Sequence, residues 1–538
     1  MAYFIGIDYG SDSARAVLCD EQGKMICGSV KNYPRWEKGL YCDSSKQIYR
    51  QHPLDYVEVL EYILKDVVSQ CPDPAQIKGI AMDATCSTPG FVDSKLNPLA
   101  FQDKYIEDPD AMFVMWKDHS VFAEAAEITA LCAEWKDSGK ADFNFACHSG
   151  SNYSPECYWA KILNVFRRRE DIKEDTFTLL ELCDFIPAVL TGCHDLKDLK
   201  ASHCAASAKH LWSEEWGGFP PDAFFDTLDP SLTALRHNMK DENFYCDCAA
   251  GNLCREWADK LGLGTDVIVG VGNIDSYAGA TAAGVGPGKM VMNIGTAGCF
   301  LTEMPTAKMS GRYVPGVFGQ VDGGIRRGCY LYEVGMSAFG DMFAWLRRLL
   351  SYSSGMDGKE IMAKLTADAE NLPLDSNIPI AIDSFNGRRS PDPNDNIPAT
   401  LMGLRITTSA PEIYHALVQA SAFAAKMNIR HLEKYDVMTD KIMAVGGIAQ
   451  KSPFVMQVLA DVTGYDINVI DCKDSCALGN AMSAAVASGF CSCLEEAQEK
   501  MFPGIMKTYH PNPANADYYE ARFEKYLATI GFTENNFQ

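Results

Sequence analysis

Residues 4–18, FIGIDYGSDSARAVL, decide how the N-terminal part of the chain folds. Phe4 to Ile7 predict a buried strand, and Ala14 to Leu18 predict a strand that returns beside it. The segment Gly10 to Ser13 between them has the Gly and Ser content of a tight turn. The sequence therefore predicts a β-hairpin whose tip exposes backbone N–H groups, with Asp8 at the base of the tip.

Residues 289–301, KMVMNIGTAGCFL, repeat this pattern in the second half of the chain. They again predict a strand, a turn with Gly and a hydroxyl residue, and a returning strand. A repeat this short can arise by chance, but its place near the start of each half is the one that a duplicated fold requires. The polar positions correspond in order, Asp8 with Asn293, Gly10 with Gly295 and Ser11 with Thr296.

Strands and helices alternate around both hairpins. Residues 54–69, behind Pro53, place their apolar side chains on one stripe and predict a helix. Short strands are expected at residues 79–83, which end in Asp83, and at residues 267–269. This alternation is typical of an α/β protein.

The C-terminal part continues the alternation. A strand is expected at residues 442–445, ending at Gly446-Gly447, and a helix at 454–463 behind Ser452-Pro453, with Ser as its cap and Pro at its first position. A further helix at residues 477–485, ALGNAMSAA, is rich in small residues. Such residues let two backbones approach closely, as a hinge between lobes needs.

Composition excludes several classes of protein. The chain has 538 residues, 47% hydrophobic and 22% charged, as in a packed globular protein. Lys and Arg number 48 against 71 Asp and Glu, so the formal charge is −23 and neither nucleic acid nor an anionic membrane is an expected partner. Any phosphate must be met locally. The 20 Cys, behind an N-terminus with no basic signal-peptide segment, predict reduced thiols and a cytoplasmic location.

Two common nucleotide-binding motifs do not fit. Residues 284–290, GVGPGKM, place Met where a P-loop needs Ser or Thr, and Gly270-x-Gly272 lacks the third Gly of a dinucleotide fingerprint. The two hairpin tips fit better, because tips that face each other across a cleft can grip a phosphate chain from both sides. For either tip alone a plain β-turn is the alternative. Together with Gly446-Gly447, they favour a nucleotide.

Several strings carry a resemblance to a known family. The chain resembles the FGGY carbohydrate kinases of the actin/hexokinase/Hsp70 superfamily, and within them the ribulokinase branch. The similarity runs from the first residues to about residue 490. Its strings are GSDSARA at 10–16, YPRW at 33–36, MFVMWKDH at 112–119, ELCD at 181–184, GQVDG at 319–323, SAFGD at 337–341 and FNGRR at 385–389.

The resemblance implies an α/β fold of two actin-like (ribonuclease H-like) lobes, with insertions and a cleft between them. Residues 1–265 form the lobe with the sugar and phosphate contacts, and residues 266–538 form the nucleotide-binding lobe. ATP and Mg²⁺ are the implied cofactors, with Asp8 at the metal, and a homodimer is an open alternative to a monomer. The implied nucleotide-binding residues are Gly10, Ser11, Asp12, Gly295, Thr296, Gly446, Gly447 and Lys451.

Asp275 matches the catalytic Asp of the family. It follows a buried strand and precedes a stretch of small residues, and it would accept the proton of the attacking sugar hydroxyl. The alternative from sequence position is a carboxylate that caps a helix.

The sugar contacts implied by the resemblance come from Ser87 and Thr88 in the loop 86–89, from Lys209, Asp275 and Glu333, and from Trp116 as part of the pocket lining. In the loop, Cys86 follows Thr85 where the family commonly has Gly or Ala. Lys209 and Glu333 have the alternative of solvated surface charges, and Trp116 that of a core residue. The loop 386–393 carries Arg388 and Arg389, for which a structural salt bridge or an interface is at least as plausible as phosphate recognition.

The resemblance therefore implies phosphorylation of ribulose, L-ribulose above all, by ATP at its terminal hydroxyl, in L-arabinose catabolism. One alternative is another sugar or polyol kinase of the family, acting on D-ribulose, xylulose or glycerol. A second is a non-catalytic sugar or nucleotide sensor on the same fold.

Overall fold

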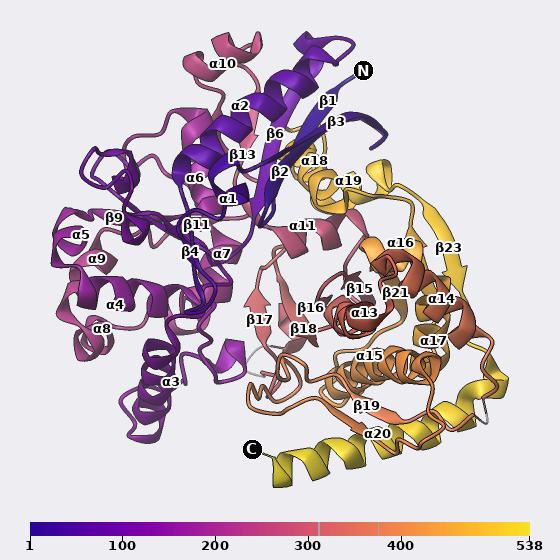
Figure 1. Cartoon of the computed structure of the whole chain (residues 1–538). Helices are drawn as coiled ribbons and strands as arrows, with labels where there is room; N and C mark the ends of the chain where they lie inside the picture. The colour runs from indigo at the N-terminus through magenta and orange to yellow at the C-terminus, as the bar shows by residue number, and fades with distance from the viewer. Residues whose placement is uncertain (310–312, 375, 538) are drawn as a thin grey trace.

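The computed structural model describes residues 1–309, 313–374 and 376–537. Two seven-stranded sheets form the framework, one in each half of the chain (Figure 1). The first runs in the order β12-β13-β6-β1-β2-β3, with β14 beside β6, and the second in the order β17-β18-β16-β15-β21-β22-β23. The first contains β1 (Tyr3–Tyr9), β2 (Ser13–Asp20), β3 (Met25–Asn32), β6 (Ile77–Ala84), β12 (Ala249–Asn252), β13 (Ile268–Gly270) and β14 (Asn273–Ile274). The second contains β15 (Lys289–Ile294), β16 (Gly298–Pro305), β17 (Gly319–Asp322), β18 (Cys329–Met336), β21 (Lys441–Val445), β22 (Ile467–Ile470) and β23 (Ile505–Tyr509).

The two sheets share the same order and direction of strands. In each, a hairpin pairs antiparallel with a third strand on one side and parallel with a later strand on the other, a second parallel strand follows, and an antiparallel strand closes that edge. The hairpins are β1–β2 and β15–β16, as the sequence predicts. The same chain order extends over five strands of each sheet, whereas the edge strand β12 precedes β13 and the edge strand β23 follows β22.

The division between the halves lies later than residue 265. The strand predicted at residues 267–269 is β13, and it pairs with β6 of the first sheet, as does β14. The sequence places it at the start of the second lobe because it precedes the second hairpin, whereas its pairing puts it in the first sheet. A boundary at 265/266 cuts that sheet, and we propose one after β14.

Helices cover both faces of each sheet (Figure 1). One face of the first sheet packs on α2 (Pro53–Ser69), α6 (Leu182–Thr191) and α10 (Arg255–Leu261). One face of the second packs on α13 (Gly340–Ser354), α14 (Gly358–Glu370), α15 (Ala410–Glu433), α17 (Pro453–Thr463) and α20 (Ala516–Asn536). The remaining faces share a core with α11 (Asp275–Ala282), α18 (Ser475–Ala487) and α19 (Leu494–Met501). These three helices thus lie between the two sheets and join them.

Small residues make this junction possible, as predicted for residues 477–485. A Cβ on Gly6 of β1 would lie 1.7 Å from the carbonyl oxygen of Ala477 in α18, and a Cβ on Gly479 would lie 1.9 Å from that of Ala278 in α11. No side chain fits at such separations. Helix α18, from the C-terminal part of the chain, therefore packs directly on the first strand, β1.

Further helices form an insertion with its own core in the first half. They include α3 (Phe122–Asp137), α4 (Tyr158–Arg168), α8 (Asp222–Leu228) and α9 (Pro230–His237), and α7 (His203–Lys209) joins them to the sheet. The predicted helix at 454–463 is α17, but its Ser452 makes no capping hydrogen bond through its side chain. All twenty cysteines are unpaired thiols.

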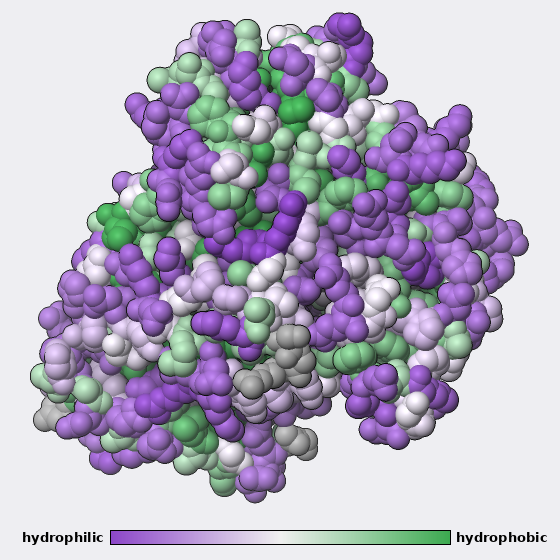
Figure 2. All heavy atoms as spheres, turned by 180° about the vertical axis from the view of Figure 1, so that it is seen from behind, coloured by the Kyte–Doolittle hydropathy of each residue, from purple (hydrophilic) through white to green (hydrophobic). Residues whose placement is uncertain are grey.

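The surface is predominantly hydrophilic on the face shown in Figure 2, where hydrophobic residues occur in small groups. Among the described residues, no helix is both long enough and apolar enough to span a membrane.

Candidate active site

A cavity of about 280 Å³ lies where the two halves meet. Five of its lining residues carry charge, which is unusual for a cavity that could otherwise be filled by apolar side chains. The first half contributes Thr85, Cys86, Trp116, Glu156, Lys209 and Ile274, and the second contributes Asp275, Ser276, Asn293, Gly295, Thr296, Ala297, Cys299, Glu333 and Arg389. A ligand here touches both halves at once.

Asp275 enters the cavity as the first residue of α11, immediately after β14. Ile274 occupies the capping position, and the Asp275 carboxylate accepts from the adjacent Ser276 N–H at 2.6 Å. Asp275 is therefore not the N-cap residue, although its carboxylate accepts a hydrogen bond within the first turn of the helix. Burial, together with the negative charge of Asp8, raises the pKa of Asp275 to about 7. A carboxylate with that pKa is suited to take a proton near neutral pH.

Lys209 and Glu333 also lie in the cavity, each only 8% exposed. Neither is a solvated surface charge. Glu333 accepts from the Tyr277 hydroxyl at 3.3 Å, and the Lys209 ammonium lies 4.4 Å from the centre of the Phe318 ring. Burial is the largest single influence on Lys209 and lowers its pKa, but the nearby acidic groups, led by the Glu333 carboxylate, together raise the pKa by more, so the amine stays charged.

Trp116 connects the cavity to the first hairpin tip. Its indole N–H donates to the Ser11 hydroxyl at 2.9 Å, and its ring lines the cavity. Asp12, one residue on, is exposed and accepts from the indole of Trp36 at 2.7 Å.

Ser87 and Thr88 lie behind the cavity wall. Both are fully buried, and Glu181 accepts from the Ser87 hydroxyl at 2.8 Å and from the Thr88 backbone N–H at 2.7 Å. Thr85 and Cys86 of the same loop line the cavity in their place. Cys86, which stands where the family commonly has Gly or Ala, is thus one of the residues that line the cavity.

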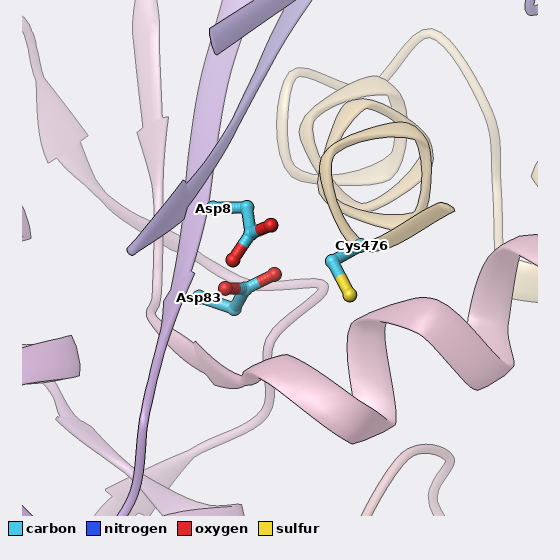
Figure 3. A group of neighbouring side chains, drawn as sticks. All are labelled: Asp8, Asp83 and Cys476. Atoms are coloured by element: carbon cyan, nitrogen blue, oxygen red, sulfur yellow. The ribbon is translucent and has the colours of Figure 1, made fainter. Parts of the chain in front are cut away.

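Asp8 has an acidic partner on the neighbouring strand. Asp8 of β1 pairs with Asp83 of β6 in the parallel register, and Figure 3 shows their carboxylates facing each other. Carboxylate oxygens of both, with the Cys476 sulfur, lie within 4.8 Å of one another. Arg15 Nε lies 3.4 Å from Asp8. Burial raises the pKa of both carboxyls, and the negative charge of Asp8 raises that of Asp83 further.

This acidic pair fits a hard divalent cation. One oxygen of Asp83 is buried without a hydrogen-bond partner, and two facing carboxylates supply the oxygen ligands that Mg²⁺ prefers. Burial raises the pKa of the Cys476 thiol well above its ordinary value, so it stays protonated and is a poor ligand.

The two hairpin tips and Gly446 are the remaining groups that the sequence assigns to nucleotide binding. The N–H groups of Gly10 and Gly295 close their own turns, bonding to the carbonyls of Ser13 at 3.0 Å and Ala297 at 3.1 Å. They are therefore occupied, and a phosphate must use the groups that follow. Gly446 has a φ of +100°, and a Cβ there would lie 2.5 Å from the carbonyl oxygen of Ile294. Only glycine fits this position beside the second tip.

The remaining residues predicted to bind the nucleotide are exposed to solvent. Gly447, the first residue of α16 (Gly447–Lys451), has no atom within 4 Å of where its Cβ would lie. Thr296 at the second tip and Lys451 at the end of α16 are both exposed. Lys451 is not among the residues that line the cavity, so its role in nucleotide binding stays a prediction.

Sequence reasoning missed Glu156 and did not place Arg389 in the site. They form an ion pair of 3.0 Å in the cavity wall. No motif marks Glu156, because its neighbours in sequence are not part of the site. Arg389 does belong to a quoted string, but its orientation is a tertiary property. Asp83 could have been found, since the predicted strand at 79–83 has an acidic end.

Comparison with known proteins agrees with this geometry. The model of the FGGY family of carbohydrate kinases, C-terminal domain, matches residues 290–488. A ribulokinase of Vibrio parahaemolyticus is 36% identical over 97% of this chain and 94% of its own length, and one of Shouchella clausii is 34% identical over 97% and 94%. The chain therefore belongs to the FGGY family of carbohydrate kinases.

Solved structures show the same fold. A xylulose kinase from Lactobacillus acidophilus superposes with a TM-score of 0.81 at 20% identity, over 100% of this chain and 99% of its own. A xylulose kinase from Rhodospirillum rubrum gives 0.79 at 20% identity, over 99% of each chain. The two-lobed actin-like α/β fold predicted from sequence is confirmed.

Proposed function

We propose that this kinase transfers the γ-phosphoryl group of ATP to the terminal hydroxyl of ribulose, L-ribulose above all, giving ribulose 5-phosphate. The observation that carries the proposal is the match over nearly the whole chain to several curated ribulokinases at 31–36% identity. L-arabinose catabolism is the pathway that fits such an enzyme. The charged cavity supports it, because a polyol is told from its isomers by directed hydrogen bonds.

Asp275 is the proposed general base. Its carboxylate takes the proton of the terminal hydroxyl while that oxygen attacks the phosphorus in line with the departing ADP. Lys209 and Glu333, two further charged groups of the cavity, orient the sugar hydroxyls. Closing the halves around the sugar excludes water, which would otherwise compete as the nucleophile.

ATP is proposed to lie between the two hairpin tips, with its adenosine near Gly446 and Gly447. Asp8 and Asp83 would hold Mg²⁺, which neutralises charge on the phosphates when bound. Ser11, Thr296 and the amides after each Gly are the proposed phosphate contacts. A homodimer and a cytoplasmic location stay predictions.

A coupled assay of ADP release tests the proposal. L-ribulose, D-ribulose, xylulose and glycerol are offered in turn at equal concentration, with ATP and Mg²⁺. We expect the highest kcat/KM with a ribulose. Equal turnover of glycerol would contradict the choice of substrate, and no turnover of any sugar would favour a sensor.

A further inference from the structure

The ion pair between Arg389 and Glu156 bridges the two halves at the sugar cavity. Glu156 precedes α4 in the helical insertion, whereas Arg389 lies in the loop after β19 (Ile380–Ile382) of the second half. One guanidinium nitrogen lies 3.0 Å and 3.3 Å from the two Glu156 oxygens. Both side chains line the cavity, and neither has a part in the reaction described above.

The surroundings fix the guanidinium of Arg389. It lies 4.6 Å from the centre of the Phe318 ring, the same ring that Lys209 approaches to 4.4 Å. Its loop is tied to β18, because the Ser390 hydroxyl bonds to the backbone N–H and carbonyl of Gly335 at 2.9 Å and 3.2 Å. Arg389 is therefore held in place before a sugar binds.

Arg388, its neighbour in sequence, behaves differently. It pairs with Glu534 at 2.6 Å and donates to the Asp392 carbonyl at 3.0 Å, and it is not among the residues lining the cavity. Two consecutive arginines thus face different environments. Arg388 serves as a matched control for any substitution of Arg389.

The pair is not fully closed to a ligand. The side chains of Arg389 and Glu156 keep 17% and 13% of their area exposed. A guanidinium has five N–H donors and no acceptor, while a carboxylate only accepts. The pair therefore offers adjacent donor and acceptor groups, which complement a carbonyl oxygen beside a hydroxyl.

Ribulose carries that arrangement only in its open-chain form. Ring closure would join the C5 hydroxyl to the C2 carbonyl carbon, so a sugar with its C5 hydroxyl free to attack has a free C2 ketone beside the C1 hydroxyl. Asp275, Glu333 and the ion pair line the same cavity, and the charge of Glu333 raises the pKa of both Asp275 and Arg389. One short sugar in this cavity can thus contact both Asp275 and the ion pair.

We propose that Arg389, oriented by Glu156, donates a hydrogen bond to the C2 carbonyl oxygen of the open-chain ketose, while Glu156 accepts one from the C1 hydroxyl. The pair is then a specificity determinant for 2-ketoses over the corresponding polyols. It makes sugar binding depend on both halves of the chain. This inference rests on the proposed function, since it assigns contacts to its substrate.

The test compares L-ribulose with ribitol, its reduced form, in Arg389→Gln, Glu156→Gln and Arg388→Gln. In R389Q we expect the KM for L-ribulose to rise about 10- to 100-fold, as for loss of a hydrogen bond to a charged group, with a smaller change for ribitol and none in the KM for ATP. E156Q, which keeps the shape of the side chain, should also lose part of the preference for L-ribulose over ribitol, but less of it than R389Q. R388Q should keep the wild-type ratio.

Other outcomes separate the explanations. Equal losses of kcat/KM for L-ribulose and ribitol in R389Q would overturn the carbonyl contact. The same holds if R388Q and R389Q behave alike. Thermal melting followed by circular dichroism reports whether each variant folds. If R389Q does not fold, the substrate preference of E156Q tests the proposal instead. A wild-type enzyme that phosphorylates neither compound contradicts the proposed function instead.

Discussion

The two hairpins, β1–β2 and β15–β16, share a topology but differ in charge. In the first, Asp8 lies opposite Asp83 of the parallel neighbour, and in the second, Asn293 lies opposite Val445 at the corresponding place. Gly6 in the first likewise corresponds to Val291 in the second. The backbone was thus repeated while the side chains at the strand ends diverged.

The difference assigns distinct tasks to the two copies. The first gathers Asp8, Asp83 and Asp275 within electrostatic reach of one another, and burial raises the pKa of each. The second has neutral groups at its tip and open space at Gly447. The proposed cation and proton chemistry therefore lies beside the first copy, and the proposed nucleotide is better accommodated by the second, where fewer carboxylates repel its phosphates.

The largest expected effect comes from removing the base. Asp275→Asn keeps the shape of the side chain but cannot take a proton, so kcat should fall by roughly 10²–10⁴-fold. ATP affinity, measured by titration calorimetry, should change little, because the nucleotide groups lie on the hairpin tips. Near-normal turnover would remove Asp275 from its role.

The next effect sharpens the contrast between Asp8 and Asn293. Asp8→Asn should raise the Mg²⁺ concentration for half-maximal activity by about 10- to 100-fold, because it removes a charged ligand. The matched change, Asn293→Asp, should leave the Mg²⁺ requirement unchanged and raise the KM for ATP by repulsion. If the two variants have the same Mg²⁺ profile, the copies do not divide the work as inferred.

The pH dependence follows from the raised pKa of Asp275, about 7. Only the deprotonated carboxylate acts as a base, so kcat/KM should fall about tenfold for each pH unit below that value and level off above it. Steady-state measurement of kcat/KM from about pH 5.5 to about pH 8.5 tests this dependence. A value of kcat/KM that stays constant between about pH 6 and about pH 8 would contradict a base with this pKa.

The smallest effect concerns stability. Gly6→Ala would press a methyl group onto the backbone of α18, whereas the corresponding residue of the second copy, the fully buried Val291, has room for its side chain. We expect the free energy of unfolding to drop by about 1–3 kcal/mol, measured by urea denaturation. Gly531→Ala, in α20 with no atom within 4 Å of the added Cβ, should be neutral or stabilising by up to about 1 kcal/mol. Equal losses in both would refute close packing at Gly6.

Local patterns predicted the fold well. The hairpins, the helix behind Pro53 and the small-residue helix lie where the sequence places them, because side-chain periodicity and turn chemistry act within a few residues. The lobe boundary was less well placed, since a strand's sheet partner is a long-range choice. Of the predicted sugar-binding residues, the structure places Asp275, Lys209, Glu333 and Trp116 in one cavity, whereas Ser87 and Thr88 lie behind its wall.

By itself the sequence determined two glycine-tipped hairpins, their repeated order and the family to which the chain belongs. Those features depend on residues adjacent in the chain. Only the tertiary structure decided that Asp83 faces Asp8, that Arg389 meets Glu156 while Arg388 turns to Glu534, and that Cys86 rather than Ser87 borders the cavity. Each is a contact between segments far apart in sequence, or an orientation set by such contacts, and it exists only once the two sheets have packed around α11 and α18.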